Sequence, residues 1–560
     1  MRVPLIWRTI GLVSVLGLAA CVGSASSRGA APEGTGNGAS ATGTAGSTGS
    51  AGIVPAGPAT GAGGSGGDSL PPEREVESSY KAPVATGHFV WIANPTSGRV
   101  AYVDASSLTV KTVEAGNGPT YLAVVPGTDD AVIVLNALSN DATYLHASGT
   151  TLDSRTIEGV AAGSNAWAVS PDGRFAVAWT DGRLVPAAPA TQGFHDVTVI
   201  DLQAAATASS STTLAVGYRP VSISFAAKDS SRAFAVTQDG VSVVSLATGA
   251  VVDTVPLGAN GGTDPEDTQD VSITPDGRLA VVRRDGSAVV AVVDLASHAR
   301  SELTLSGPVT DVDVSSDGAR AVAVVRATAE VAVLPLAGHA PAASDVTHVT
   351  IAGETIGQVT LTAGGTVAVL YSNALSSQRL TVLTLSGTPA FHVVRLHAPV
   401  LSALPTPDGK FAVVLHPVDT GADGGVSADA GAAQTPTVTP DATAFSLVPL
   451  DGTQPPRIEM AEAPIQAVAI APASDRVLLT VRDDNKQIFA AHLGLLPTLE
   501  VKSYPLASPP IAAGVVGGAN RGYVAQEYPD GRITFLTLDS GDARTLTGYE
   551  LGARVVQWSE

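Results

Sequence analysis

The sequence is short of cysteine, aromatic residues and charge. Its one cysteine, Cys21, excludes a disulfide framework and any zinc site built on several thiolates. Aromatic residues make up 4% and charged residues 15% of the 560 residues, and so little charge excludes the composition of a generic disordered chain. Acidic residues outnumber basic ones by 51 to 31, which gives a formal net charge of −20. Because no cationic surplus is present to neutralise phosphates, nucleic acid is not an expected partner.

The first twenty residues have the pattern of an export signal. Arg2 and Arg8 precede an apolar run over residues 10–20, which is too short for a bilayer core of about 30 Å but suits a signal peptide. The run ends in Leu18-Ala19-Ala20-Cys21, which resembles the lipobox of bacterial lipoproteins. The resemblance implies that residues 1–20 are removed and that Cys21 carries the lipid. The alternative is an ordinary secretory signal followed by a chance cysteine.

The resemblance to lipoproteins also indicates a location. Val22, and not Asp, follows the cysteine, and under this resemblance that favours sorting to the outer membrane. Several acyl chains anchor a protein firmly, because each buried CH₂ contributes about 0.8 kcal/mol. We therefore expect a lipid-anchored protein of the cell envelope.

Residues 21–87 are expected to form a flexible linker. From Val22 to about Gly67 they are Gly, Ala, Ser and Thr with a few Pro, and such a stretch cannot bury enough surface to offset its ordering entropy. Five basic and five acidic residues balance up to residue 87. The net charge of −20 therefore belongs to residues 88–560.

Residues 88–560 have the pattern of an all-β repeat protein. Short runs of Val, Ala, Leu and Thr are separated by turn residues every 8–12 positions, and no stretch keeps a helical period. Two markers recur, a Pro that opens a strand and a Pro-Asp-Gly turn after that strand. Between Pro119 and Pro510 lie eight repeat steps of about 49 residues each. The turn is clearest at Ser170-Pro171-Asp172-Gly173-Arg174, Thr274-Pro275-Asp276-Gly277-Arg278, Ser315-Ser316-Asp317-Gly318 and Thr406-Pro407-Asp408-Gly409-Lys410.

Each repeat is expected to contain four antiparallel strands. In the fifth repeat these are Asp270–Thr274, Arg278–Val282, Ala288–Leu295 and Arg300–Leu305. Four strands in roughly 40–50 residues are typical of a β-propeller blade. The sequence therefore predicts an all-β propeller.

The first repeat resembles a known family. Val90-Trp91-Ile92-Ala93-Asn94, Arg99-Val100-Ala101-Tyr102-Val103-Asp104 and Gly116-Asn117-Gly118-Pro119 are similar to the YVTN family of propeller repeats. The Pro-Asp-Gly-Arg turns are similar to the TolB-type repeat, which is WD40-like. The resemblance implies two further functions. Some such propellers hydrolyse small esters or lactones at a metal in the central channel, and TolB-like propellers are partners of envelope machines.

The strand count predicts ten blades within a range of seven to ten. Leading strands are expected near residues 119, 164, 220, 269, 308, 357, 399, 464 and 509, while residues 88–115 supply three strands without a leading one. We expect the C-terminal strand, residues 553–558, to complete this first blade and to close the ring. Two half-size rings, dividing near Gly307 or Ala398, are the alternative.

One face of the propeller is expected to bind a partner. The loops from the second to the third strand (B–C) and from the fourth strand to the next blade (D–A) share that face, and the long insertions 181–195, 259–269 and 418–443 are all of these types. Neutral insertions are the alternative. Carboxylates that could bind Ca²⁺ occur in the second insertion, where a solvated acidic loop is the alternative. They are Asp264, Glu266, Asp267 and Asp270.

The sequence predicts a non-catalytic binding or scaffold module. The ten His are scattered, neither Gly-x-Ser-x-Gly nor a phosphate loop occurs in the repeats, and no catalytic or cofactor-binding residue is assigned. The expected partner is a protein or a glycan at the B–C/D–A face of a monomer, which is held to the membrane by its lipid. The alternatives are a hydrolase of the lactonase type with a channel metal and a TolB-like assembly factor.

Overall fold

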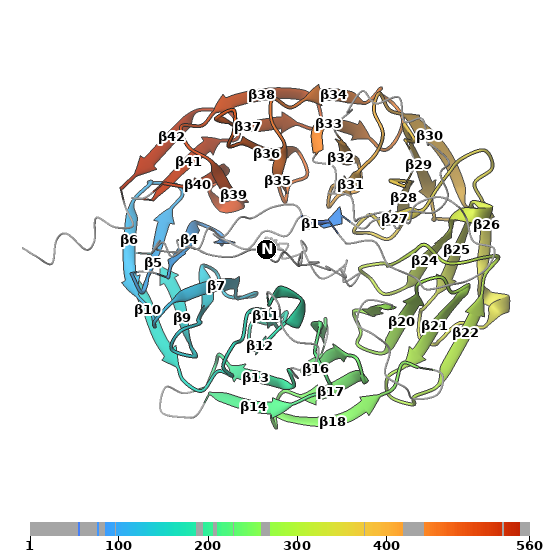
Figure 1. The fold of residues 1–560 in the computed structure, drawn as a ribbon, viewed down its shortest axis with the longest axis horizontal. Coiled ribbons are helices and arrows are strands. Elements are labelled where there is room, and N and C mark those ends of the chain that lie inside the picture. Colours follow the sequence, from blue (N-terminus) through green and yellow to red (C-terminus); the bar gives the residue numbers. More distant parts are fainter. Residues whose placement is uncertain are drawn as a thin grey trace, which may run out of the picture.

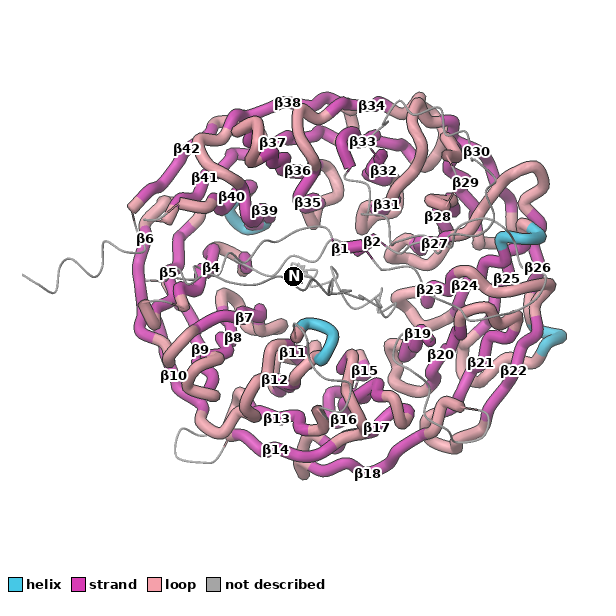
Figure 2. The backbone as a smooth tube through the Cα atoms, in the orientation of Figure 1, coloured by secondary structure: helices cyan, strands magenta, loops and turns pink. Residues whose placement is uncertain are grey.

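The protein is a single ring of ten four-stranded antiparallel blades (Figure 1). The computed structural model describes residues 54–55, 76–77, 84–95, 97–149, 151–185, 194–204, 210–227, 229–258, 269–374, 376–417, 442–528 and 531–548. The predicted propeller and its ten blades are confirmed, and the alternative of two half-size rings is wrong. In each blade the first strand lies nearest the axis and the fourth lies at the rim (Figure 2).

The forty blade strands follow one another along the chain without exchange between blades. Blades 1 to 3 comprise β3 (Val84–Ala85), β4 (Phe89–Asn94), β5 (Arg99–Asp104), β6 (Val110–Glu114); β7 (Pro119–Val124), β8 (Ala131–Asn136), β9 (Asp141–Ser148), β10 (Thr151–Ile157); β11 (Ala166–Val169), β12 (Phe175–Trp179), β13 (Asp196–Asp201) and β14 (Ser211–Ala215). Blades 4 to 6 comprise β15 (Ser222–Ala226), β16 (Asp229–Thr237), β17 (Gly240–Ser245), β18 (Ala250–Val255); β19 (Gln269–Ile273), β20 (Leu279–Arg284), β21 (Val289–Asp294), β22 (Arg300–Thr304); β23 (Asp311–Val314), β24 (Arg320–Val325), β25 (Glu330–Pro335) and β26 (Thr347–Thr350). Blades 7 to 10 comprise β27 (Gln358–Leu361), β28 (Val367–Tyr371), β29 (Arg379–Thr384), β30 (Ala390–Arg395); β31 (Ser402–Pro405), β32 (Phe411–Pro417), β33 (Ala442–Pro449), β34 (Arg457–Met460); β35 (Ile465–Ile470), β36 (Arg476–Asp483), β37 (Ile488–Leu495), β38 (Glu500–Pro505); β39 (Pro510–Val516), β40 (Arg521–Gln526), β41 (Arg532–Thr537) and β42 (Ala543–Thr547).

Outside the blades, β1 (Val54–Pro55) pairs antiparallel with β2 (Val76–Glu77). The helices of the described residues are four short 3₁₀ turns, as the lack of a helical period predicted. They are η1 (Gly182–Leu184), η2 (Arg326–Thr328), η3 (Ala343–Asp345) and η4 (Gly517–Ala519). Within the part of the chain that the structure describes, no helix has the length and apolar character needed to cross a membrane.

The core lies between the blades. Ten apolar clusters occur, one at each of the ten interfaces between neighbouring blades. The second and third strands of a blade are therefore covered on both faces, and all six residues of β8 are buried. This explains why these strands are continuous runs of Val, Ala, Ile and Leu, while the rim strands alternate with polar residues.

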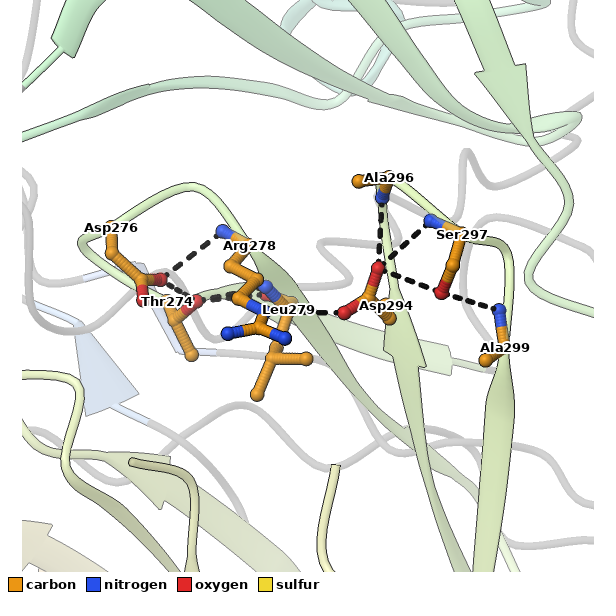
Figure 3. Close-up of polar contacts among 8 residues, drawn as sticks. All are labelled: Thr274, Asp276, Arg278, Leu279, Asp294, Ala296, Ser297 and Ala299. Carbon is orange, nitrogen blue, oxygen red and sulfur yellow. Dashed lines mark hydrogen bonds and ion pairs between the residues drawn. The ribbon is translucent and has the colours of Figure 1, made fainter. Parts of the chain in front are cut away.

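The Pro-Asp-Gly marker makes the turn between the first and second strands of a blade (Figure 3). In blade 5 the Thr274 hydroxyl donates to the Asp276 carboxylate at 2.6 Å and accepts from the Leu279 N–H at 3.0 Å. The same carboxylate accepts from the Arg278 N–H at 3.1 Å, and Gly277 takes a φ of 67° that a side chain would disfavour. The Arg278 side chain then pairs with Asp294, which ends β21, at 3.2 Å. The Asp276 turn between β19 and β20 is therefore linked, through Arg278, to the connection between β21 and β22.

Replacing Thr274 by Val should test this turn, because Val keeps the shape of the side chain and removes its hydroxyl. Thr274 is buried, so the Leu279 N–H loses an acceptor that water cannot replace. We expect the free energy of unfolding to fall by about 1–2 kcal/mol. Urea denaturation measures the change, and Thr453→Val, at an exposed turn, is the control. Equal midpoints for the Thr274→Val variant and the wild type would contradict the role of the hydroxyl.

The first blade is completed from its N-terminal side. β3 pairs with β4, so it takes the inner position that we expected the C-terminal strand to fill, and that expectation is wrong. Residues 553–558 themselves lie outside the described residues. The sequence held a signal for β3, because Pro83 stands directly before Val84 just as Pro464 stands directly before β35.

The ring closes where blade 10 packs against blade 1 (Figure 1, red beside blue). The cluster at this interface includes Val90, Val103, Tyr523 and Phe535. In addition, the Gly518 N–H donates to the Gly87 carbonyl at 3.0 Å. Side-chain packing and a bond between turns close the ring, and each blade keeps its own four strands.

Candidate binding site at the channel mouth

All B–C and D–A connections emerge on one face of the ring, which we call the mouth face. This follows from the strand order, because second strands end and first strands begin at the same side of every blade. The three long insertions join β12 to β13, β18 to β19 and β32 to β33, so they share this face as the sequence predicted. Residues 186–193, 259–268 and 418–441 of these insertions lie outside the described residues.

In blade 3 the mouth face begins with a rigid polar turn. Asp181 follows β12 and caps η1, and its carboxylate binds the Arg183 guanidinium through two nitrogens at 3.0 and 2.8 Å. The Asn165 side chain makes two hydrogen bonds to the backbone of Asp181. Its oxygen accepts from the Asp181 N–H at 2.8 Å, and its nitrogen donates to the Asp181 carbonyl at 3.1 Å. Arg183 also donates to the Val221 carbonyl at 2.7 Å, and so it joins blade 3 to blade 4. Two-point contacts of this kind fix an Arg in one orientation.

The next connection, from blade 3 to blade 4, packs directly beside this turn. A Cβ at Gly217 would lie 2.2 Å from the Thr237 hydroxyl, so the chain passes where only glycine fits. The Tyr218 N–H donates to Asp239 at 2.6 Å, and the Tyr218 ring lies 5.3 Å from the ring of His195. Arg219 follows with a φ of 50°. The mouth of blades 3 and 4 therefore carries aromatic and cationic side chains on an ordered backbone.

In blade 5 one guanidinium lies among carboxylates of two strands and one connection. Arg283, near the end of β20, pairs with Asp270 on β19 and with Asp285 at 2.9 Å. Burial lowers the pKa of Arg283, but Asp270, Asp285 and Asp311 together raise it above its ordinary value. The carboxylates belong to blades 5 and 6, and the cation that lies among them is the Arg283 guanidinium.

In blade 6 two carboxyl groups lie on the inner strand β23, where Asp313 is buried and Asp311 is half-buried by exposed area. Asp311 accepts from the Val359 N–H and Asp313 from the Leu361 N–H, each at 2.7 Å, and both donors belong to β27 of blade 7. Burial raises the pKa of Asp311 to about 7, against the effects of the Val359 N–H and Arg283. Burial and, to a smaller extent, the neighbouring charge of Asp311 raise the pKa of Asp313 to about 8, against the effect of the Leu361 N–H. Carboxyl groups with strongly shifted pKa values occur more often at functional sites than elsewhere.

The predicted calcium ligands are only partly described. Asp264, Glu266 and Asp267 lie outside the described residues, while Asp270 is the cross-strand neighbour of Arg283 and forms an ion pair with it. Among the residues that the structure describes, no group of three or more His, Cys, Asp or Glu side chains could hold a metal ion. Calcium binding therefore stays a prediction, as does lipidation of Cys21, which also lies outside these residues.

One buried pair has the outline of a catalytic dyad. His416 Nε2 lies 2.7 Å from the Ser446 hydroxyl, and its Nδ1 lies 2.7 Å from the Pro399 carbonyl. Burial lowers the pKa of His416. The same two positions are filled by Asn136 with Thr143 at 2.9 Å in blade 2 and by Gln526 with Thr534 at 2.7 Å in blade 10. The Asn–Thr and Gln–Thr pairs cannot act as a catalytic dyad, yet they make the same contact between the second and third strands of their blades. We therefore assign the His416–Ser446 pair a structural role, which is to join these two strands.

Sequence reasoning missed Arg283, Asp311 and Asp313, although a signal for them was present. β23 reads Asp-Val-Asp-Val on an inner strand, and β20, a second strand covered on both faces, ends in Arg283-Arg284. Charged residues at such positions need buried partners. The pattern therefore marks an ionic cluster, but it does not tell which blade supplies the partners.

Comparisons with known proteins find only distant structural similarity, and the fold is argued from the strand order of this chain alone. No family model matches the chain, and no curated protein matches it, so the similarity to YVTN and TolB-type repeats remains a resemblance. Among solved structures, dihydro-heme d1 dehydrogenase NirN in complex with DHE is similar, at 14% identity and a TM-score of 0.39 over 67% of this chain and 73% of that chain. Kuenenia stuttgartiensis hydrazine synthase is similar at 16% identity and a TM-score of 0.31, over 59% and 95% of the two chains. At these values no activity is transferred to this protein.

Proposed function

We propose that this chain is a lipid-anchored propeller of the cell envelope that binds a protein or glycan partner through its mouth face. One observation carries the proposal. The long insertions and the ordered polar groups of blades 3 to 6 meet on the same face. Long loops on a rigid scaffold, with polar groups already held in place, are the usual arrangement of a binding surface.

The alternative functions have less support. A channel metal of the lactonase type needs several ligands around an open position, whereas described carboxylates at the mouth bind cations of the protein, Asp270 and Asp285 binding Arg283 and Asp181 binding Arg183. A TolB-like assembly factor would use the same binding face and would differ in holding a stable stoichiometric partner. We therefore propose the binding module, and the nature of its partner decides between a scaffold and an assembly factor.

Site-directed photo-crosslinking tests which face is used. A photoreactive residue at Leu184 on η1 should give a discrete adduct in intact cells, since this side chain is 42% exposed at the mouth face. The control position is Val252 on rim strand β18, which is apolar and 56% exposed. The same adduct at Val252, or an adduct there alone, would contradict binding through the mouth face.

Lipid anchoring has its own test. The Cys21→Ser variant lacks the thiol that lipidation requires, so it should move from the membrane fraction to the soluble fraction of lysed cells. The wild type, fractionated in parallel after a high-salt wash, is the control for peripheral attachment. Retention of the variant in the washed membranes would refute lipidation at Cys21, while leaving the proposed binding face untouched.

A further inference from the structure

The junction between blades 6 and 7 adds polar bonds between its inner strands to the apolar packing of the interface. The inner strands β23 and β27 are joined by three bonds that side chains of blade 6 make to the backbone of blade 7. Thr310 donates to the Gly357 carbonyl at 2.7 Å, and the Asp311 and Asp313 carboxyl groups accept from the Val359 and Leu361 N–H groups. These bonds link the inner strands of two neighbouring blades.

Charge is poorly balanced at this junction. Asp311 and Asp313 lie two residues apart on one strand, so their side chains share a face. The second strand of blade 5 packs against β23 and supplies Arg283, which Asp270 and Asp285 accompany, whereas Arg284 donates to the Leu257 carbonyl on the side of blade 4. Arg320 on β24 donates to the Leu385 carbonyl at 3.1 Å, and β27 holds no titratable residue. Arg283 is thus shared by several carboxylates, while the charge acting on Asp313 among the described residues is that of Asp311, which has the same sign.

We propose that this junction is a proton-controlled latch, closed while Asp311 and Asp313 are protonated and loosened when both become charged. A protonated carboxyl still accepts from an N–H through its carbonyl oxygen, so the three bonds persist in the neutral form. Ionisation leaves two like charges in a buried site that was already rich in carboxylates. Because β23 and β27 begin at the mouth face, opening the latch changes the shape of the proposed binding surface.

The direction of the pH effect follows from linkage. Burial raises the pKa of Asp313 to about 8 and that of Asp311 to about 7, both above the ordinary value of 3.8. The folded state therefore binds more protons than the unfolded state between about pH 4 and pH 8. Stability contributed by these groups is fully present below pH 4 and is lost as the pH rises through 7 to 8.

Amide hydrogen exchange on the full-length protein tests the latch. After correction for the intrinsic exchange rate, protection of the β27 amides should fall about tenfold or more between pH 6 and pH 8.5. Protection of β15, the inner strand of blade 4, should change much less and serves as the internal reference. An equal change in β15 and β27 would overturn the proposal, and this comparison needs no variant.

Two variants sharpen the test. Asp313→Asn keeps an oxygen for the Leu361 N–H and cannot ionise, so most of the pH dependence of β27 protection should vanish. Asp317→Asn, in the same blade, is the matched control, because hydrogen bonds from Ser315 and Ala319 hold the pKa of Asp317 below its ordinary value despite partial burial. An undiminished pH dependence in Asp313→Asn would overturn the latch, whatever the outcome of the crosslinking at Leu184.

Discussion

A variant that begins at His88 is expected to have a free energy of unfolding about 3–5 kcal/mol lower than that of a variant that begins at Val84. The four residues between these two starts form β3 and the turn that follows it. Thr86 accepts from the Trp91 indole N–H at 3.0 Å and donates to Asp130 of blade 2 at 2.8 Å. Trp91 is fully buried, so its N–H would remain unpaired in the shorter chain.

The same four residues also carry the closure of the ring. Without Gly87 the Gly518 N–H loses its acceptor, and blade 10 loses this hydrogen bond to blade 1. Denaturant midpoints of the two purified variants measure the difference. Deletion of residues 549–560 is the control, and we expect no change of midpoint, because residues 84–547 fill all forty strand positions of the ring. Equal midpoints for the His88 and Val84 starts, or a large loss on the C-terminal deletion, would contradict this closure.

Replacement of Arg283 by Gln is expected to have an effect of similar size, a loss of about 3–5 kcal/mol at pH 7.5. The guanidinium is mostly buried, and it is paired with Asp270 and Asp285. Gln removes the cation and leaves these carboxylates, together with Asp311, without a counter-charge. The loss should be smaller at pH 5, because Asp311 is then protonated and less negative charge is left uncompensated.

Arg174→Gln is the matched control for the Arg283 variant. Arg174 also pairs with a carboxylate, Asp201, at 3.2 Å, but its side chain is 48% exposed. Exposed ion pairs contribute little, so we expect a change within about 1 kcal/mol. Thermal unfolding of the two variants at both pH values gives the comparison. Equal losses for Arg174→Gln and Arg283→Gln would show that the mouth cluster does not depend on its central cation.

The blade pattern was predictable because local chemistry sets it. A Pro cannot continue a strand and a Pro-Asp-Gly turn ends one, so strand starts expected near 119, 220, 308 and 464 are found at 119, 222, 311 and 465. β3 was missed because it has only two residues and adjoins a stretch that reads as linker. A strand this short has no alternation to recognise, and Pro83 lies in residues 21–87, whose composition predicts a linker.

The mouth clusters could not be predicted to the same degree. The sequence places Asp270 and Asp285 on either side of Arg283, but the link from Asp313 to the Leu361 N–H spans 48 residues and depends on how two blades pack. Likewise, Asp181 and Arg183 look like an ordinary turn until Asn165 and Val221 are brought beside them. Spacing along the chain tells which face a connection occupies, and contacts between blades decide which side chains meet there.

The most direct measurement of the proposed function is a hydrogen-exchange footprint of the full-length protein with and without the partner captured by the Leu184 crosslink. The account predicts added protection in the segments around Asp181–Arg183, Tyr218–Arg219 and Arg283–Asp285, which border the mouth on blades 3 to 5. The Pro-Asp-Gly turns of the opposite face, such as the one at Asp276, should show no added protection. Added protection confined to those turns or to the rim strands would contradict a binding site at the channel mouth.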